Sequence, residues 1–241
     1  MSVLYLIVKN YYSENIKVVY NSIIPITHRR FALFNGEIYP TRKGVIVWRE
    51  SISYERLWTT LFLEGEGIVT VSSKNMLGDS EPFVWGYFNF QKTLKGKGYF
   101  LFEADIKDDI LYIRKRRDSL FAAVRWSKYL RRYLVPEQPD DSLLVNLYWC
   151  MKLLTVPVVP ADAVTWRLLR LWLEEWGLAP ELVPFHTEKG FNQEEIALLA
   201  QVPALTYKGI INLFTGRLSP SIRENIFKVA SELALEFFNE T

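Results

Sequence analysis

Residues 44–71 constrain the fold of this chain more than any other stretch. Three runs in it have the apolar content and the period-two alternation of short β-strands: residues 45–50, 55–62 and 68–71. A polar break at residues 51–53 separates the first two runs. Gly65 and Gly67 allow a tight turn before the third. Three short strands in a row, near the front of a domain, predict the start of a compact antiparallel barrel.

Two later runs, residues 82–90 and 99–104, would complete a barrel of five strands, and the OB fold is the commonest module of that kind. Phe83, Trp85 and Tyr87 alternate onto one face of the fourth run. That face is either a stacking platform for nucleic-acid bases or part of the core.

The residues before and after this barrel have different patterns. Strands are expected at residues 3–8, 16–20, 23–26 and 31–34, and Asn35-Gly36 is a strong turn signal. From Ile110 the apolar period becomes helical and predicts five or six helices. We therefore expect an α+β protein with a β-rich N-terminal extension (1–43), an OB-like five-stranded barrel (44–107) and an all-α helical domain (108–241).

Capping residues predict where the helices begin and end. Asp140 or Asp141 can cap a helix over residues 142–154, and Asp162 a helix over 163–176 that Gly177 would end. Asn192 would cap a helix over residues 193–201, and Thr206 would open one that ends near Phe214. Ser219-Pro220 would open the last helix, to about residue 238.

Composition excludes several classes of site. The 241 residues carry a net charge of only +2, so any nucleic-acid site must come from a local basic patch. The single cysteine, Cys150, excludes an intramolecular disulfide and a cysteine-clustered zinc site. This cysteine usage favours the cytoplasm. No apolar run is long enough to span a membrane, so we expect no membrane partner.

The sequence offers little evidence of a catalytic site. His28 and His186 are far apart in sequence, and no phosphate-binding glycine loop or dinucleotide fingerprint is present. We expect no enzymatic activity, no metal and no cofactor.

Basic residues are densest just after the predicted barrel. Arg125, Lys128 and Arg132 share one helical face at spacings of three and four, and such a stripe can neutralise phosphates. The alternative is an ordinary solvated face. Phe121 would interrupt a longer stripe. The candidate DNA-binding residues are Lys74, Lys92, Lys95, Lys97, Arg114, Lys115, Arg116, Arg117, Arg125, Lys128, Arg131 and Arg132.

Two segments carry a family resemblance. The first contains GVIV at 44–47, YE at 54–55, LFL at 61–63 and GIV at 67–69, and the second is WRLLRLWLEEWGLAPEL at 166–182. They resemble the RecO family of bacterial recombination mediators, in which an OB barrel precedes a helical domain. The resemblance covers about residues 44–241. The chain departs from the family in three places. Residues 183–191 lack the zinc-knuckle cysteines of many relatives, the loop at 73–79 has only one lysine, and residues 1–43 have no counterpart in the family.

The resemblance implies a non-enzymatic mediator that binds single- and double-stranded DNA, promotes strand annealing and assists recombinase loading. It also implies a RecR-like partner and the acidic, apolar C-terminal tail of single-strand binding protein. Trp166, Arg167, Arg170 and Trp172 have the chemistry to hold such a tail, although the same residues could simply pack the helix. The alternative function is a protein-interaction adaptor with the same fold and weak or no DNA binding.

Overall fold

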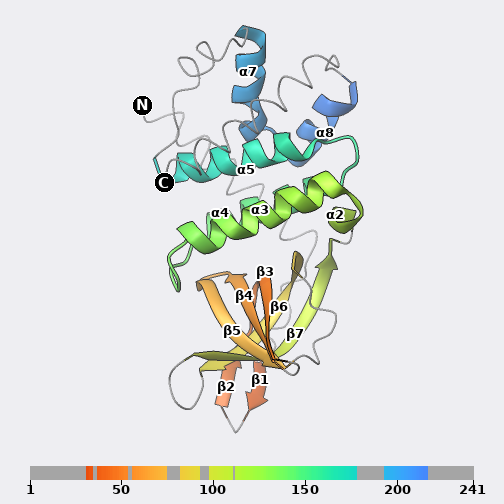
Figure 1. Ribbon diagram of the computed structural model, residues 1–241. Helices are drawn as coiled ribbons and strands as arrows, with labels where there is room; N and C mark the ends of the chain where they lie inside the picture. The colour runs from red at the N-terminus through yellow and green to blue at the C-terminus, as the bar shows by residue number, and fades with distance from the viewer. Residues whose placement is uncertain are drawn as a thin grey trace. The chain divides into compact units, whose positions relative to one another are not determined.

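The computed structural model describes residues 31–34, 37–53, 56–74, 82–92, 98–110, 112–177 and 193–216 (Figure 1). Internal contacts divide the chain into two units, Met1–Thr41 and Arg42–Thr241. In the first unit, β1 (Phe31–Phe34) and β2 (Glu37–Pro40) form an antiparallel hairpin that pairs Phe34 with Glu37. This pairing is the one that an Asn-Gly connection favours. The strands expected at residues 3–8, 16–20 and 23–26 lie outside the described residues.

Five strands of the second unit close into a barrel in the order β3-β4-β5-β7-β6 (Figure 1). They are β3 (Arg42–Ser53), β4 (Arg56–Leu63), β5 (Gly67–Lys74), β6 (Val84–Lys92) and β7 (Tyr99–Asp109). All neighbouring strands are antiparallel except β5 and β7, which are parallel. The barrel is OB-like, and helices follow it, so the expected α+β class with a five-stranded barrel is confirmed.

Strand β3 is longer than the sequence pattern predicts, since it continues through the expected polar break at residues 51–53, and its pairing with β4 has register shifts at Ile46/Trp48 and at Ser51/Ser53. Ile46 pairs with Leu61 and Trp48 pairs with Thr60, which leaves Val47 as an extra residue on β3. A bulge bends a strand and increases its twist, so one long strand can serve two neighbours of a small barrel.

Alternation along the strands separates two buried clusters. The barrel interior holds eight apolar side chains: Ile46, Leu61, Leu63, Val69, Val71, Val84, Phe88 and Leu101. On the outer surface at one end of the barrel, Val45 pairs with Phe62 and Phe62 pairs with Ile68. That row belongs to a second cluster, which also contains Trp126 and Leu147 of the helices. Barrel and helices therefore share one core.

Seven helical segments follow the barrel in the described part of the chain. They are α2 (Tyr112–Lys115), α3 (Arg117–Tyr133), α4 (Asp141–Leu154), α5 (Ala161–Glu175), α7 (Gln193–Gln201), the 3-10 turn η1 (Val202–Ala204) and α8 (Tyr207–Gly216). The last predicted helix, at residues 219–238, and the Asn192 cap lie outside the described residues. No described helix is long and apolar enough to cross a membrane.

Three of the four predicted helix ends that lie in the described part of the chain are found. The Asp140 carboxylate accepts a hydrogen bond from the Leu143 backbone N–H at 3.0 Å, and the Thr206 hydroxyl accepts one from Gly209 at 3.1 Å. Gly177 follows α5 with φ +70°. The Asp162 prediction is wrong: the N-cap position of α5 is Pro160, and Asp162 lies in the first turn. Proline precedes a helix readily because it lacks the N–H that would remain unpaired there, and a first-turn carboxylate is stabilised by the helix dipole.

A backbone junction ties the turn between β4 and β5 to the loop between α3 and α4. The Glu137 N–H donates to the Ile68 carbonyl at 3.0 Å, and Ile68 forms a parallel bridge with Pro136. Gly67 has φ +75°, and a Cβ built on it would lie 2.0 Å from the carbonyl oxygen of Gln138. Glycine is therefore required at this position for two reasons, its backbone conformation and the space it occupies.

Candidate nucleic-acid interface

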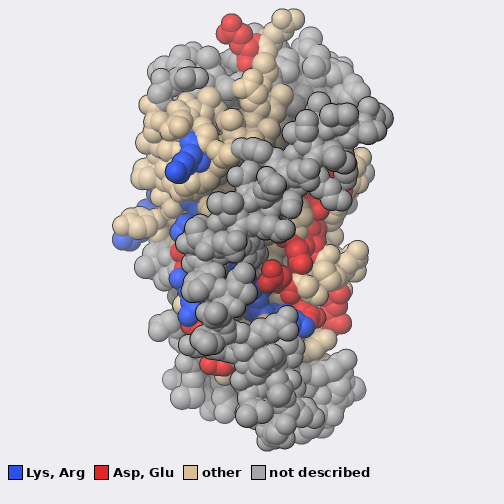
Figure 2. Space-filling view, turned by 180° about the vertical axis from the view of Figure 1, so that it is seen from behind, with Lys and Arg blue, Asp and Glu red and all other residues tan. Residues whose placement is uncertain are grey.

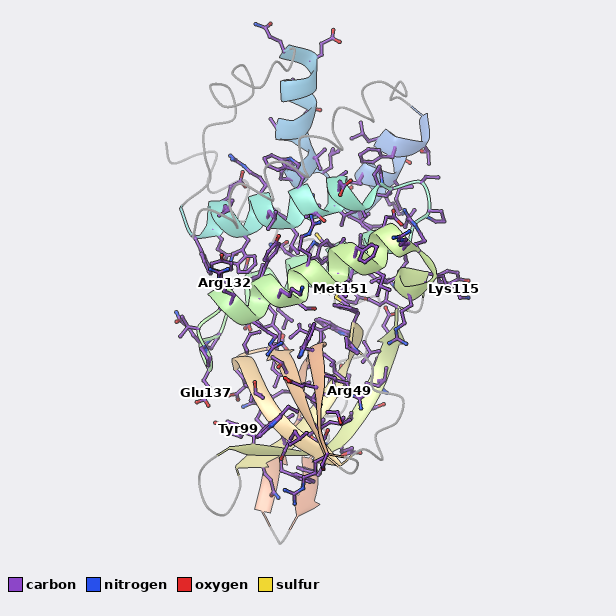
Figure 3. All side chains as sticks on the ribbon, in the orientation of Figure 1. Arg49, Tyr99, Lys115, Arg132, Glu137 and Met151 are labelled. Atoms are coloured by element: carbon purple, nitrogen blue, oxygen red, sulfur yellow. The ribbon has the colours of Figure 1, made fainter. Side chains whose placement is uncertain are left out.

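The densest basic segment is divided between two helices. Arg116 has an extended conformation (φ −116°, ψ 119°) at the N-cap position of α3, so α2 and α3 are separate. A single stripe of cations from Arg114 to Arg132 along one helix is therefore not formed. Lys115 of α2 and Arg132 of α3 lie toward opposite ends of this basic segment (Figure 3).

Two of the predicted cations, Arg114 and Arg116, form hydrogen bonds to backbone carbonyls of other segments. Arg116 donates to the Val156 carbonyl at 2.7 Å and to the Asp118 carboxylate at 2.7 Å, and its side chain is 23% exposed. Arg114 donates to the Pro82 carbonyl at 3.2 Å. Charge-assisted bonds to partly buried carbonyls cost free energy to break, so these two guanidiniums are poorly placed to bind phosphate.

One side of α3 is buried, and its polar side chains form hydrogen bonds inside the core. Ser119 donates to the Leu154 carbonyl at 3.0 Å, and Trp126 Nε1 donates to Thr165 Oγ1 at 3.0 Å. The buried residues of α3 are Ser119, Ala122, Ala123, Trp126, Ser127 and Leu130. At 100° per residue they occupy a single side of the helix, which fixes the opposite side toward solvent.

That opposite side carries five cations, which we call the basic face of α3: Arg117, Arg125, Lys128, Arg131 and Arg132. The helix has one acidic residue, Asp118, and its carboxylate is bonded to Arg116. Burial raises the pKa of Tyr129, although Arg125 partly opposes this, so the phenol stays neutral at physiological pH. The basic face of α3 therefore has a strong local positive charge on a chain of small net charge.

Phe121 lies within this basic face. It is four residues from Arg117 and four from Arg125, so the three side chains form one row along the helix. Its ring is 56% exposed, and the Arg117 guanidinium lies 5.4 Å from the ring centroid. An exposed aromatic ring among cations is unlike a purely solvated helix face.

Arg131 joins the basic face of α3 to the barrel. Its guanidinium lies 4.9 Å from the centroid of the Trp48 ring, on β3. Trp48 pairs with Thr60 of β4, and Thr60 pairs with Thr70 of β5. These residues form the next row beyond Val45, Phe62 and Ile68 on the outer surface of the barrel.

Further rows follow along the same strands. Trp58 of β4 pairs with Glu50 on β3 and with Ser72 on β5. Trp58 is 41% exposed, and Arg56, two residues earlier on the same side of β4, is also exposed. We call the side chains of Trp48, Glu50, Arg56, Trp58, Thr60, Thr70 and Ser72 the outer face of the barrel. In OB folds the second and third strands, here β4 and β5, form the common oligonucleotide-binding face.

Two of the predicted lysines of the barrel lie at strand ends. Lys74 ends β5 with Arg56 as its pairing partner, and Lys92 ends β6 opposite Tyr99; their side chains are outside the described part of the structure. Lys95 and Lys97 also lie outside it. Strand β7, which follows them in the chain, starts beside β5, because Ser72 Oγ donates to the Tyr99 carbonyl at 3.3 Å. Tyr99 lies on the barrel near Glu137 of the α3–α4 loop (Figure 3).

Two of the three aromatic side chains predicted on one face of the fourth barrel strand pack in a core, and the third, Tyr87, is partly buried. Phe83 and Trp85 are buried in the core shared with the helices. Trp85 packs against Tyr148 of α4 with 4.6 Å between ring centroids. Core packing, the alternative to base stacking, is thus confirmed for Phe83 and Trp85. Among the described residues, Trp58, Phe121 and Tyr112 are exposed aromatics near cations, and the Tyr112 ring centroid lies 4.8 Å from Lys115 Nζ. The sequence left Trp58 open between base stacking and core packing, and it indicated Phe121 only as an interruption of the basic stripe.

The residues proposed to hold a protein tail are mostly inside the helical core. Trp166, Arg167 and Trp172 are buried. The Arg167 guanidinium donates to the carbonyls of Val202 and Pro203. Arg170 donates to Glu174 at 2.6 Å on a more exposed side. An open cleft rimmed by all four side chains does not fit this burial, because three of them pack between helices.

Charge is also segregated on the far side of the molecule. Helix α3 lies on the near side of the helices in Figure 1, and Figure 2 shows the opposite side. There the acidic side chains gather mainly along one edge, and the basic ones lie mainly toward the other.

Within the described residues, no three His, Cys, Asp or Glu side chains are close enough to hold a metal ion.

Comparison with known proteins does not identify a family for this chain. Neither the models of known protein families nor the curated proteins contain a match to this chain.

Proposed function

We propose that this chain is a non-enzymatic DNA recombination and repair mediator that binds DNA through the basic face of α3 and the outer face of the barrel. The observation that supports this most is the contact between Arg131 and Trp48, which connects five helical cations to the strands of an OB-like barrel. Cations bind phosphates without reading sequence, which suits a protein that must act on any strand.

The resemblance to the RecO family extends this proposal to activity and partners. The chain would bind single- and double-stranded DNA, promote annealing and assist recombinase loading. Its protein partners would be a RecR-like protein and the C-terminal tail of single-strand binding protein. These parts of the proposal rest on the resemblance in residues 44–71 and 166–182.

A salt titration tests DNA binding. A labelled oligo-dT strand is titrated by fluorescence anisotropy at several salt concentrations with the wild type and with an Arg125→Gln/Lys128→Gln/Arg132→Gln variant. Each lost phosphate contact on a single strand lowers the slope of log K against log salt by about 0.7, so the variant should lose about 2.

A matched pair of single variants controls for net charge. Lys128 on α3 and Lys208 on α8 are both exposed lysines of helices. Lys128→Gln should lower the salt slope, whereas Lys208→Gln should leave it unchanged. Absence of binding by the wild type at low salt would contradict the proposal. So would equal effects of the two single variants.

The alternative is a protein-interaction adaptor that keeps the fold and binds DNA weakly or not at all. The small net charge and the use of Arg114 and Arg116 as ties to backbone carbonyls favour it. It predicts no salt-dependent binding in the titration above, together with retained binding to a protein partner.

A further inference from the structure

We infer that this DNA site is selective for single strands, with unpaired bases stacking on Phe121 and Trp58. This inference rests on the proposed function, since it describes how the same two faces would hold their ligand. Charge alone attracts duplex and single strands alike, and the two exposed aromatic rings are what distinguish them.

Both rings are far more exposed than the aromatic side chains of the core. Phe121 is 56% exposed and Trp58 is 41% exposed, whereas the core aromatics Trp126, Phe62, Phe88 and Phe214 are fully buried. Phe121 lies in a row between Arg117 and Arg125 on the basic face of α3. Aromatic rings beside cations bind unpaired bases by stacking, while the bases of a duplex are already stacked on one another.

The two rings lie at opposite ends of one path. Phe121 is ten residues before Arg131 on α3, about 15 Å along the helix. Arg131 lies over Trp48, and Trp58 is a diagonal neighbour of Trp48 across β3 and β4, roughly 7 Å away. Lys128 and Arg132 lie on the helical part of the path. A strand following it would meet aromatic, cationic and aromatic side chains in turn.

The path is not uniformly favourable to DNA. Glu50 is exposed and pairs with Trp58. Its carboxylate repels phosphate, so near Trp58 the base should face the protein and the backbone should face away. Arg56, on the same side of β4, is placed to hold a phosphate beyond Trp58.

The test compares three ligands at one salt concentration: oligo-dT, an abasic strand of the same length, and a hairpin duplex. The proteins are the wild type, Phe121→Ala, Trp58→Ala and the control Trp176→Ala. Trp176 is 42% exposed at the end of α5, so its removal matches that of Trp58 in size and exposure, and it belongs neither to the basic face of α3 nor to the outer face of the barrel. Thermal unfolding checks that each variant folds.

Phe121→Ala and Trp58→Ala should each weaken oligo-dT binding roughly 5- to 150-fold, the range for loss of one stacked base. Binding of the abasic strand and of the duplex should change less than about twofold, since phosphate contacts remain. Trp176→Ala should behave as the wild type.

Other outcomes would separate the two proposals. If the wild type binds oligo-dT and duplex equally, and the two variants lose neither, the stacking inference is overturned while DNA binding stands. If Trp58→Ala and Trp176→Ala weaken oligo-dT binding equally, the inference is overturned as well. If the wild type binds none of the three ligands, the proposed function is overturned together with the inference.

Discussion

Replacing Gly67 with alanine tests the junction between barrel and helices. The substitution has two costs. A residue with a side chain at φ +75° is disfavoured by about 1–2 kcal/mol. In addition, the new Cβ would lie 2.0 Å from the Gln138 carbonyl oxygen and 2.5 Å from its carbon. Both contacts are to backbone, so relieving them requires a backbone shift, which costs about 1–3 kcal/mol more.

Gly65 provides the matched control. It has φ +72°, and no atom lies within 4 Å of a Cβ built on it. Gly65→Ala should therefore cost only the conformational part, about 1–2 kcal/mol, and Gly67→Ala about 2–5 kcal/mol in total. Urea unfolding followed by tryptophan fluorescence gives both values. Equal destabilisation by the two substitutions would refute the close approach of Gly67 to Gln138.

Three other perturbations follow from local surroundings. Burial raises the pKa of the Cys150 thiol to about 12, so a thiol reagent at pH 8 should label this residue only when the protein unfolds. Rapid labelling of the native protein would contradict the burial of Cys150. Burial, and after it the charge of Asp108, raises the pKa of Tyr148 from 10.0 to about 12. The unfolded chain therefore loses this proton at lower pH than the folded protein, so stability should fall as the pH rises from 10 to about 12. Tyr148→Phe should make this fall in the urea midpoint shallower, and an unchanged pH profile would refute the reasoning. Glu50→Gln removes the anion paired with Trp58 and should tighten oligo-dT binding roughly two- to fivefold, measured by anisotropy at low salt; weaker binding would contradict the location of the site.

The architecture follows from local pattern to a large degree. Period-two alternation in residues 45–71 and the glycine turn at 65–67 predict the first three strands, and Asp140, Thr206 and Gly177 mark helix ends through capping chemistry. These signals act over a few residues, so a sequence displays them. The one wrong cap, Asp162, arose because an acidic residue in the first turn and an N-cap residue resemble each other in sequence.

The surface of the site could not be predicted to the same extent. Arg116 and Lys115 are neighbours with the same charge, yet Arg116 is bonded to the Val156 carbonyl, 40 residues away. The bulge at Val47 and the pairing of β4 with β5 determine that Trp58 faces outward, and both depend on register across strands. The basic face of α3 was partly predictable, because three of its cations have helical spacing within one element.

Photocrosslinking tests the central claim most directly, namely that α3 and the barrel hold one DNA strand together. An oligo-dT strand carrying iododeoxyuridine at single positions is crosslinked to the wild-type protein and the modified peptides are identified by mass spectrometry. The proposed path predicts adducts in both segments, residues 117–132 and residues 56–72, from the same oligonucleotide. Adducts confined to other parts of the chain, or none under conditions in which the strand is bound, would contradict it.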